Sequence, residues 1–423
     1  MKGIERFFRY IGILTPSDEN SQNHPSSACE FNLAHELVKE LQALGVSDAF
    51  VDENCYVYGH IPPTPGREEM PAIGLIAHMD TVSDFCDAAP NPQIIENYDG
   101  SDVPLGTSGR VLRVTDFPHL SQLKGRTLIT TDGTTILGSD DKFGIAEIMT
   151  VVEQLAGMPH GPVSVAFTPD EEIGRGTEDF RTDVFGAKYA FTLDGEAEGE
   201  VQYESFNAAG AEVSFRGNNV HPGSAKNVMV NAALVAMEFN EMLNSAQRPE
   251  YTENYQGFIH LTDMTGSVAE ARLKYILRDH DRNMLAAKKA GMELAAQRLN
   301  EKYGAGTVEL VIQNQYQNMA EILKDYPEVM EVARKVCRSC GVSPISVPIR
   351  GATDGAILSF RGLPCPNLGT GGYAFHGPYE HLTVEGMDKM VEILLEILRL
   401  FLFLYSSAIF SYILYACIST YSS

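Results

Sequence analysis

Apolar positions between residues 30 and 205 follow two alternating periods. Apolar residues spaced three and four apart predict helices at 30–45 and 143–157, and the first of these patterns stops at Gly45. Short apolar runs predict buried strands at 72–78, 163–169 and 190–195. Strands alternating with helices indicate the α/β class, in which active sites gather at the carboxyl ends of the strands.

The pattern changes from about residue 206 to 318. Strand-like and helical segments now follow in the order β-α-β-β-α-β, which is typical of a ferredoxin-like α+β unit. The predicted strands are 210–217, 257–268, 270–281 and 307–316, and the predicted helices are 225–244 and 283–304. We therefore predict an inserted domain at 206–318 within a catalytic domain formed by 1–205 and 319–399, closed by a helix from Val384.

Composition narrows the class of protein. A chain of 423 residues, 44% hydrophobic and 21% charged, is typical of a soluble globular protein with two domains. A net charge of −24 and a pI near 4.8 argue against nucleic acid or an anionic membrane as a partner. The 7 cysteines are widely spread and indicate reduced thiols in the cytoplasm. Cys337 and Cys340 form a CxxC without a second pair, which disfavours a zinc or redox role.

The two ends of the chain raise the question of a membrane. Glu5 interrupts the N-terminal apolar residues, so no secretory signal is predicted. Residues 400–423 carry no charge and match the roughly 20 residues that a membrane span requires. A membrane anchor and a non-native extension are both open for this tail, and we expect no membrane partner unless the anchor is genuine.

Polar residues follow the predicted strands. His78 and Asp80 lie two positions apart, so on an extended chain they project to one side and Asp80 can orient the imidazole. Polar residues that simply end a strand are the alternative. Asp140 and Asp141 stand at a strand-to-helix turn, where capping of the helix is the plain alternative.

Three further clusters complete the set. Residues 170–172 are adjacent carboxylates, which repel one another unless a cation lies between them. Asp194 ends another strand, and a glycine-rich loop carries both His376 and His381. Imidazole and carboxylate ligands without thiolates favour Zn²⁺, Mn²⁺ or Co²⁺ in a hydrolytic site. A carboxylate shared by two ions would make a two-metal hydrolase.

Several of these motifs resemble the di-zinc family of aminopeptidases, carboxypeptidases and amino-acid deacylases, and its tripeptide aminopeptidases in particular. The resemblance runs in order from Ile4 to Leu398 and rests on "AHMDTV", "GSDDKFGIAEI", "TPDEEIGRGTEDF", "NNVHPGSAKNVMVNA", "YILRDHDR" and "PIRGATDGAILSFRG". It implies an α/β/α catalytic domain with a mostly parallel mixed sheet, a ferredoxin-like lid domain and a homodimer formed through the lid.

The family resemblance also implies an activity. We expect a zinc-dependent aminopeptidase that releases the N-terminal residue from short peptides, above all tripeptides. A dipeptidase, a carboxypeptidase or an N-acyl amino-acid deacylase with the same chemistry is the alternative. A non-enzymatic binding protein on a decayed scaffold would have lost ligands or the base, whereas the five positions that the family uses as metal ligands, Asp80 and Glu171 are intact here.

The resemblance assigns metal ligands to two Zn²⁺ ions per subunit, for which Mn²⁺ or Co²⁺ can substitute. His78 and Asp194 would bind the first ion, Glu172 and His376 the second, and Asp140 both. At position 381 the family typically carries an apolar residue, which favours the other histidine of that loop as the ligand.

Further roles follow from the same resemblance. Asp80 would clamp His78, Glu171 would be the general base, and the peptide bond between Asp140 and Asp141 would be cis. His221 would stabilise the oxyanion of the intermediate, although a histidine in "HPG" is also a common turn residue.

The ends of the substrate need partners as well. Arg278 and Arg350 are candidate clamps for the peptide carboxylate, with structural salt bridges to nearby aspartates as the alternative. We add the hypothesis that Glu196, where the family tends to carry glycines, provides negative potential near the free ammonium group.

Overall fold

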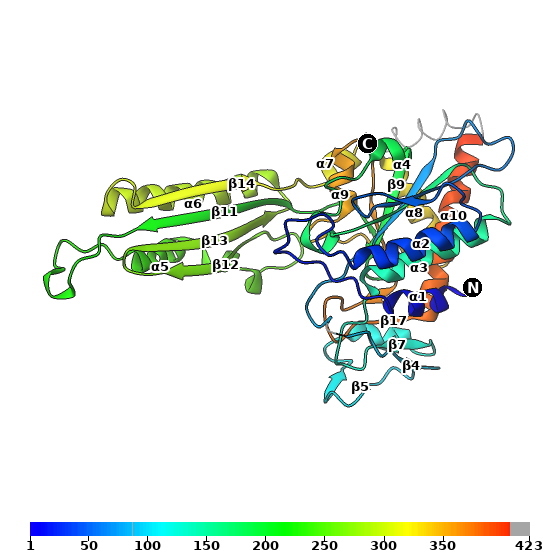
Figure 1. The fold of residues 1–423 in the computed structure, drawn as a ribbon, viewed down its shortest axis with the longest axis horizontal. Coiled ribbons are helices and arrows are strands. Elements are labelled where there is room, and N and C mark those ends of the chain that lie inside the picture. The colour runs from blue at the N-terminus through cyan, green and yellow to red at the C-terminus, as the bar shows by residue number, and fades with distance from the viewer. Residues whose placement is uncertain (87, 407–423) are drawn as a thin grey trace, which may run out of the picture. The chain divides into compact units, whose positions relative to one another are not determined.

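The computed structural model describes residues 1–86 and 88–406, which form two compact units (Figure 1). Unit 1 comprises Met1–Tyr203, Ile322–Ser346 and the described residues from Thr353 onward, and unit 2 comprises Glu204–Glu321 and Val347–Ala352. Residues Val347–Ala352 group with unit 2 because their backbone is hydrogen-bonded to it. The Ile349 N–H donates to the Glu204 carbonyl oxygen at 2.9 Å.

A seven-stranded mixed sheet forms the centre of unit 1. Strands β8, β3, β9 and β15 are mutually parallel, whereas β1, β2 and β10 add antiparallel edges, in the order β1-β2-β8-β3-β9-β15-β10. The prediction of an α/β fold with a mixed sheet is therefore confirmed. The strands are β1 (Phe50–Val51), β2 (Val57–Ile61), β3 (Ile73–His78), β8 (Val163–Thr168), β9 (Tyr189–Gly195), β10 (Val201–Gln202) and β15 (Asn367–Gly369).

Helices cover both faces of this sheet, as strand β9 shows. The rings of Tyr189 and Phe191 lie 6.0 and 6.4 Å from that of Phe401 in α10, while Ala190 packs in one cluster with Phe185 of α4. Neighbouring strand residues point to opposite faces, so α10 and α4 lie on different sides. The helices are α1 (Gly3–Ile11), α2 (Glu30–Ala43), α3 (Ser139–Leu155), α4 (Thr182–Phe185), α7 (Ala320–Leu323), α8 (Pro327–Ser339), α9 (Asp354–Phe360) and α10 (Val384–Ser406).

Helix α10 corrects the predicted boundary of the apolar tail. The helix begins at Val384, as predicted, but continues past Arg399 to Ser406. Phe401 and Leu402 are only 3% and 5% exposed, so the first residues of the uncharged stretch belong to the core. Residues 407–423 of the predicted tail lie outside the described residues. Within the part that is described, no helix combines the length and apolarity that a membrane crossing requires.

A smaller sheet in unit 1 has no counterpart in the sequence predictions. Its strand order is β16-β17-β7-β4, and the hairpin β5-β6 adjoins its hydrophobic cluster, which includes Tyr98, Leu112 and Leu128. Strands of two or three residues are too short to display a period. The elements are β4 (Gln93–Ile95), β5 (Val103–Leu105), β6 (Arg110–Leu112), the 3-10 turn η1 (Pro118–Leu123), β7 (Leu128–Thr130), β16 (Gly372–Tyr373) and β17 (His381–Thr383).

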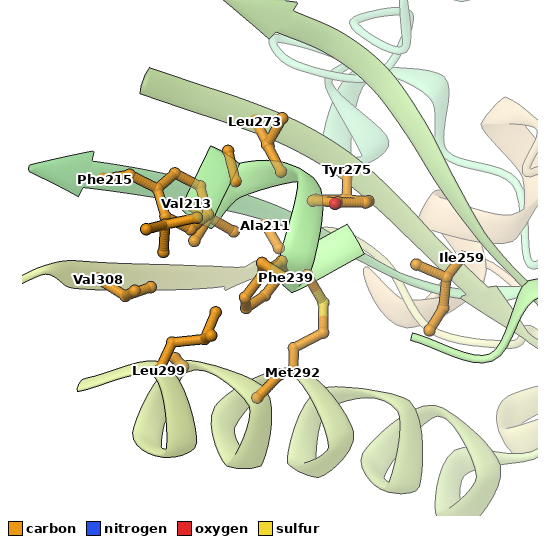
Figure 2. Packing of buried hydrophobic residues seen from close by; sticks show 14 of the residues in the cluster. Ala211, Val213, Phe215, Phe239, Ile259, Leu273, Tyr275, Met292, Leu299 and Val308 are labelled. Atoms are coloured by element: carbon orange, nitrogen blue, oxygen red, sulfur yellow. The ribbon is translucent and has the colours of Figure 1, made fainter. Parts of the chain in front are cut away.

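Unit 2 has the predicted ferredoxin-like order. Its antiparallel sheet runs β12-β13-β11-β14, and apolar side chains of the sheet and of two helices form one core, seen around Phe239 and Met292 in Figure 2. The elements are β11 (Asn207–Arg216), η3 (Pro222–Ser224), α5 (Ala232–Met242), η4 (Ser245–Gln247), η5 (Pro249–Tyr251), β12 (Phe258–Gly266), β13 (Glu270–Asp279), α6 (Arg282–Tyr303) and β14 (Val308–Asn314).

Helix α5 starts later than the apolar pattern suggested. The predicted helix began near residue 225, but the Asn231 side chain accepts the N–H groups of Ala233 and Leu234 at 3.1 and 3.4 Å. Such a cap starts the helix at Ala232. The preceding residue, Val230, instead pairs with Asn218 in an isolated bridge.

A histidine pair joins β17 to η1. His381 is 0% exposed, and its Nδ1–H donates to the Tyr379 carbonyl at 2.8 Å. Its Nε2 must then accept, so His119 Nε2–H donates to it at 2.7 Å. Burial, together with the neighbouring His119, lowers the pKa of His381 to about 4.

This pair predicts a loss of stability in mild acid. Between the unfolded pKa of about 6.5 and the folded value, the unfolded chain binds a proton at His381 that the folded chain refuses. The free energy of unfolding should fall by about 3 kcal/mol as the pH drops through this window. Urea unfolding at several pH values should show a shallower fall in His381→Gln, whereas replacing exposed His35 by Gln should leave the slope as it is. Parallel slopes in all three proteins would contradict the assignment.

Candidate metal centre

The topology of unit 1 brings the predicted ligands to one place. Strands β8, β3 and β9 are parallel neighbours, so their carboxyl ends meet at one edge of the sheet. His78 ends β3, Asp194 lies near the end of β9, and the 3-10 turn η2 (Glu171–Ile173) follows β8. Asp140 comes from the first turn of α3, where its backbone angles are non-helical.

Asp140 lies between the two predicted ligand histidines. Its Oδ1 is 2.9 Å from His78 Nε2, and its Oδ2 is 2.9 Å from His376 Nε2. His376 Nε2 also lies 3.0 Å from Glu172 Oε2, and His78 Nε2 lies 3.7 Å from Asp194 Oδ1. One carboxylate thus faces an imidazole with each oxygen, which is the arrangement that a bridging ligand needs.

The charges at this centre are not balanced by ordinary ion pairs. Burial raises the pKa of Glu172 to about 7 and that of Asp194 to about 6, and the charge of Asp140 adds to both increases. Hydrogen bonds to Asp140 and Glu172 raise the pKa of His376 to about 11. The acids are therefore crowded beyond what the two imidazoles neutralise.

These residues fit divalent metal ions. Ligand atoms of His78, Asp140 and Glu172 lie within 4.8 Å of one another, as do those of His78, Glu171 and Asp194. Glu172 Oε1 is buried and has no hydrogen-bond partner among the described residues, so this oxygen is free to ligate a metal ion. Nitrogen and oxygen donors without thiolate suit Zn²⁺ and Mn²⁺ in a hydrolytic site. The peptide bond between Asp140 and Asp141 is cis, as the family resemblance implied.

Asp80 orients both sides of the centre. His78 Nδ1 lies 3.0 Å from the Asp80 carbonyl oxygen and 3.3 Å from its Oδ1, so that nitrogen carries the proton and Nε2 faces the other ligands. The carboxylate of Asp80 also accepts the N–H groups of Glu171 and Glu172 at 2.9 and 3.1 Å. This buried side chain therefore fixes a ligand histidine and the η2 turn together.

The third acid of the stretch, Asp170, turns away from the ligands. Its Oδ2 accepts the Ser26 N–H at 2.7 Å and lies 2.9 Å from His24 Nδ1. Its own N–H donates to Glu30 Oε2 at 3.2 Å. Asp170 thus anchors the loop before α2 to the end of β8.

Glu380 is a buried residue that the sequence did not single out. Its Oε2 accepts the N–H groups of Leu137, Gly138 and Ser139 at 2.9, 2.7 and 3.2 Å, and the Ser139 hydroxyl as well. Its Oε1 accepts the backbone N–H of His376 at 3.1 Å. Glu380 therefore ties the loop before Asp140 to the loop of His376. The only sequence signal was an acid close to that histidine.

The remaining predicted site residues belong mainly to unit 2. His221 is exposed at η3, and its Nδ1 accepts the Gly223 N–H at 3.1 Å, so its Nε2 bears the proton. Arg278 on β13 donates to the Leu277 carbonyl at 3.0 Å and lies over the Tyr316 ring. Glu196, in unit 1 just after β9, has an exposed side chain.

Arg350 has a structural role within unit 2. Its guanidinium donates to the carbonyl oxygens of Asn254 and Gln256 at 2.8 and 2.7 Å and to the Thr252 hydroxyl at 2.9 Å. These bonds use the donors that a carboxylate clamp would need. The predicted salt bridges to aspartates are not found among the described residues: Asp279 pairs with Lys288 at 2.5 Å, Asp281 accepts the Met284 N–H and Asp354 the Thr168 hydroxyl.

Fold and ligand set together define a metal-dependent hydrolase whose ligands come from the strand ends of an α/β domain. The model of peptidase family M20/M25/M40 matches residues 132–400. Peptidase T of Alkaliphilus oremlandii is 48% identical over 403 residues, 94% of this chain and 98% of that protein. The chain therefore belongs to peptidase family M20/M25/M40, and the predictions of a metallopeptidase and of an aminopeptidase related to this family are confirmed.

Solved structures agree with the fold. A tripeptidase from Staphylococcus aureus matches with a TM-score of 0.75 and 21% identity, covering 95% of this chain and 98% of that chain. A peptidase from Bacillus subtilis described as binding a dinuclear metal matches with a TM-score of 0.61 and 14% identity, covering 93% and 96%. At these identities the matches show the shared fold alone.

The bracing by Glu380 predicts coupled effects on stability and metal affinity. In Glu380→Gln one oxygen is replaced by an amide NH₂, which then faces backbone N–H groups. The free energy of unfolding, measured with urea, should therefore fall by about 2–4 kcal/mol. Zinc affinity should fall by about 10–100-fold, since the variant no longer ties the two ligand loops together. Glu385→Gln, which loses one exposed bond to the Thr127 N–H, is the matched control and should change neither value appreciably. Unchanged zinc affinity in Glu380→Gln would refute the bracing role.

Proposed function

We propose that this protein is a cytoplasmic, zinc-dependent aminopeptidase that removes the N-terminal residue from tripeptides. The observation that carries the proposal is the Asp140 carboxylate shared between His78 and His376. In the proposal, two ions are held by His78 and Asp194 and by Glu172 and His376, with Asp140 common to both. The free thiols of the described cysteines support a reducing compartment.

Glu171 is the proposed general base. Burial raises the pKa of its carboxyl well above the usual range, and the charge of Asp194 adds to the increase. A base of raised pKa takes a proton from the attacking water and returns it to the leaving amine. When bound, divalent ions would acidify that water and polarise the scissile carbonyl.

Substrate binding completes the proposal. The protonated Nε2 of His221 is suited to donate to the developing oxyanion, and Arg278 to hold the peptide carboxylate. Glu196 would attract the free ammonium group. Domain 206–318 is proposed to act as a lid and as the contact of a homodimer. Arg350, by contrast, is better explained by its bonds within unit 2 than by substrate.

Adjacent acids should have separable roles. Glu171→Gln should keep its metal and lower kcat by about 10²–10⁴-fold, because only the proton transfer is lost. Glu172→Gln should lose metal as well, because it removes a ligand. Metal content by mass spectrometry and turnover of a tripeptide test both. Exposed Glu178, which pairs with Arg175, gives the control Glu178→Gln. Equal metal content in the first two variants would rule out the division.

A substrate panel tests the activity itself. The full chain should hydrolyse tripeptides faster than di- or tetrapeptides and should leave N-acyl amino acids intact, because recognition needs a free ammonium group. A chelator should abolish turnover, and zinc should restore it. Faster release of the C-terminal residue would favour a carboxypeptidase, and cleavage of N-acyl amino acids a deacylase. The full chain is used because truncation after Arg399 would remove Phe401 and Leu402, which are buried in the core.

A further inference from the structure

Unit 2 contains a pocket of about 250 Å³ that the proposed peptidase chemistry does not use. It lies between the end of α5, the turns η4 and η5, and strands β12 and β13, so it is built entirely within unit 2. Leu243, Ile259 and Leu261 form an apolar wall. The floor includes Tyr275, which is 3% exposed and whose hydroxyl donates to Asn240 Oδ1 at 3.2 Å. Figure 2 shows Tyr275 and Ile259, which also belong to the hydrophobic core of this unit.

Two opposite charges line the same pocket. Arg248 and Glu250 lie two residues apart, at the start of η5 and within it. Neither side chain has a hydrogen-bond or ion-pair partner in the part of the chain that the structure describes. Burial raises the pKa of Tyr275, and the charge of Arg248 partly offsets the increase, so this guanidinium acts on the buried phenol. The Arg248 side chain is partly withdrawn from water, whereas Glu250 is exposed at the rim of the pocket.

The segment that carries both charges is held firmly. Arg350 donates to carbonyl oxygens of Asn254 and Gln256 and to the Thr252 hydroxyl, just beyond η5. A register shift in β12 between Leu261 and Asp263 lies at the wall of the pocket. Bulges of this kind re-aim side chains and are common beside binding sites. The charged pair is thus presented by a fixed backbone.

We propose that this pocket binds a free α-amino acid with an apolar side chain. The carboxylate pairs with Arg248, the ammonium group with Glu250, and the side chain packs on the apolar wall. A simple anion would meet the carboxylate of Glu250, and a simple cation would meet the guanidinium of Arg248, so one charge alone is disfavoured. A zwitterion satisfies both groups. The site is separate from the metal ligands, and the inference does not depend on the proposed peptidase function.

The test uses a reporter inside the pocket. Full-length holoenzyme is labelled at isoleucine δ1 methyl groups, and the Ile259 signal is assigned by its loss in Ile259→Val. Titration with L-leucine should shift this signal in a saturable way. 4-Methylpentanoate, which lacks the ammonium group, and 3-methylbutylamine, which lacks the carboxylate, should bind at least tenfold more weakly. Arg248→Gln leaves the metal ligands intact, so a shift caused by leucine at the metal centre would persist in that variant.

Variants connect the signal to the two charges. Arg248→Gln and Glu250→Gln should each weaken leucine binding by about 10–100-fold. Exposed Arg298 and Glu293 on α6 give the matched controls Arg298→Gln and Glu293→Gln, which should bind like the parent protein. The inference is overturned by an Ile259 signal that leucine does not move, by full affinity in Arg248→Gln, or by 4-methylpentanoate binding as tightly as leucine.

Discussion

Repulsion among carboxylates is the constraint on which unit 1 depends. Parallel strands deliver Glu171, Glu172 and Asp194 to one edge of the sheet, and α3 adds Asp140. Burial raises the pKa of Glu172 and Asp194, since water no longer solvates their charges. An isolated cluster of this kind would be destabilising. It persists because the two imidazoles, and the divalent ions proposed above, supply positive charge between the acids.

A second set of acids keeps the first in place. Asp80, Asp141 and Glu380 are buried too, but their oxygens accept backbone N–H groups of the loops that carry the ligands. Charge-assisted bonds of this type are strong and directional. Side chains of Asp140 and Glu172 instead meet imidazole nitrogens. The hydrogen-bond partners therefore divide the acids of the site into those that face the reaction and those that hold the backbone.

Features marked by a local sequence pattern could be predicted, and features that depend on distant contacts could not. The strand-end positions of His78 and Asp194 follow from local periodicity and hydropathy, as does the order of elements in unit 2. Glu380 was missed because most of its partners, at residues 137–139, lie far away in the chain, so no local pattern marks it. The smaller sheet was missed because its strands are too short for a period. Separating His376 from the buried His381 required the family resemblance, since both follow the same glycine-rich loop.

The adjacent acids of η2 show how geometry separates identical side chains. In a 3-10 turn successive side chains point about 120° apart, so neighbouring side chains point in different directions. Asp80 accepts the N–H groups of both Glu171 and Glu172, which prevents the turn from rotating. Glu172 then lies against His376, while Glu171 lies near His78 and Asp194. Two glutamates of equal chemistry thereby reach different surroundings, and the distinction between a ligand and a base comes from the backbone that Asp80 holds.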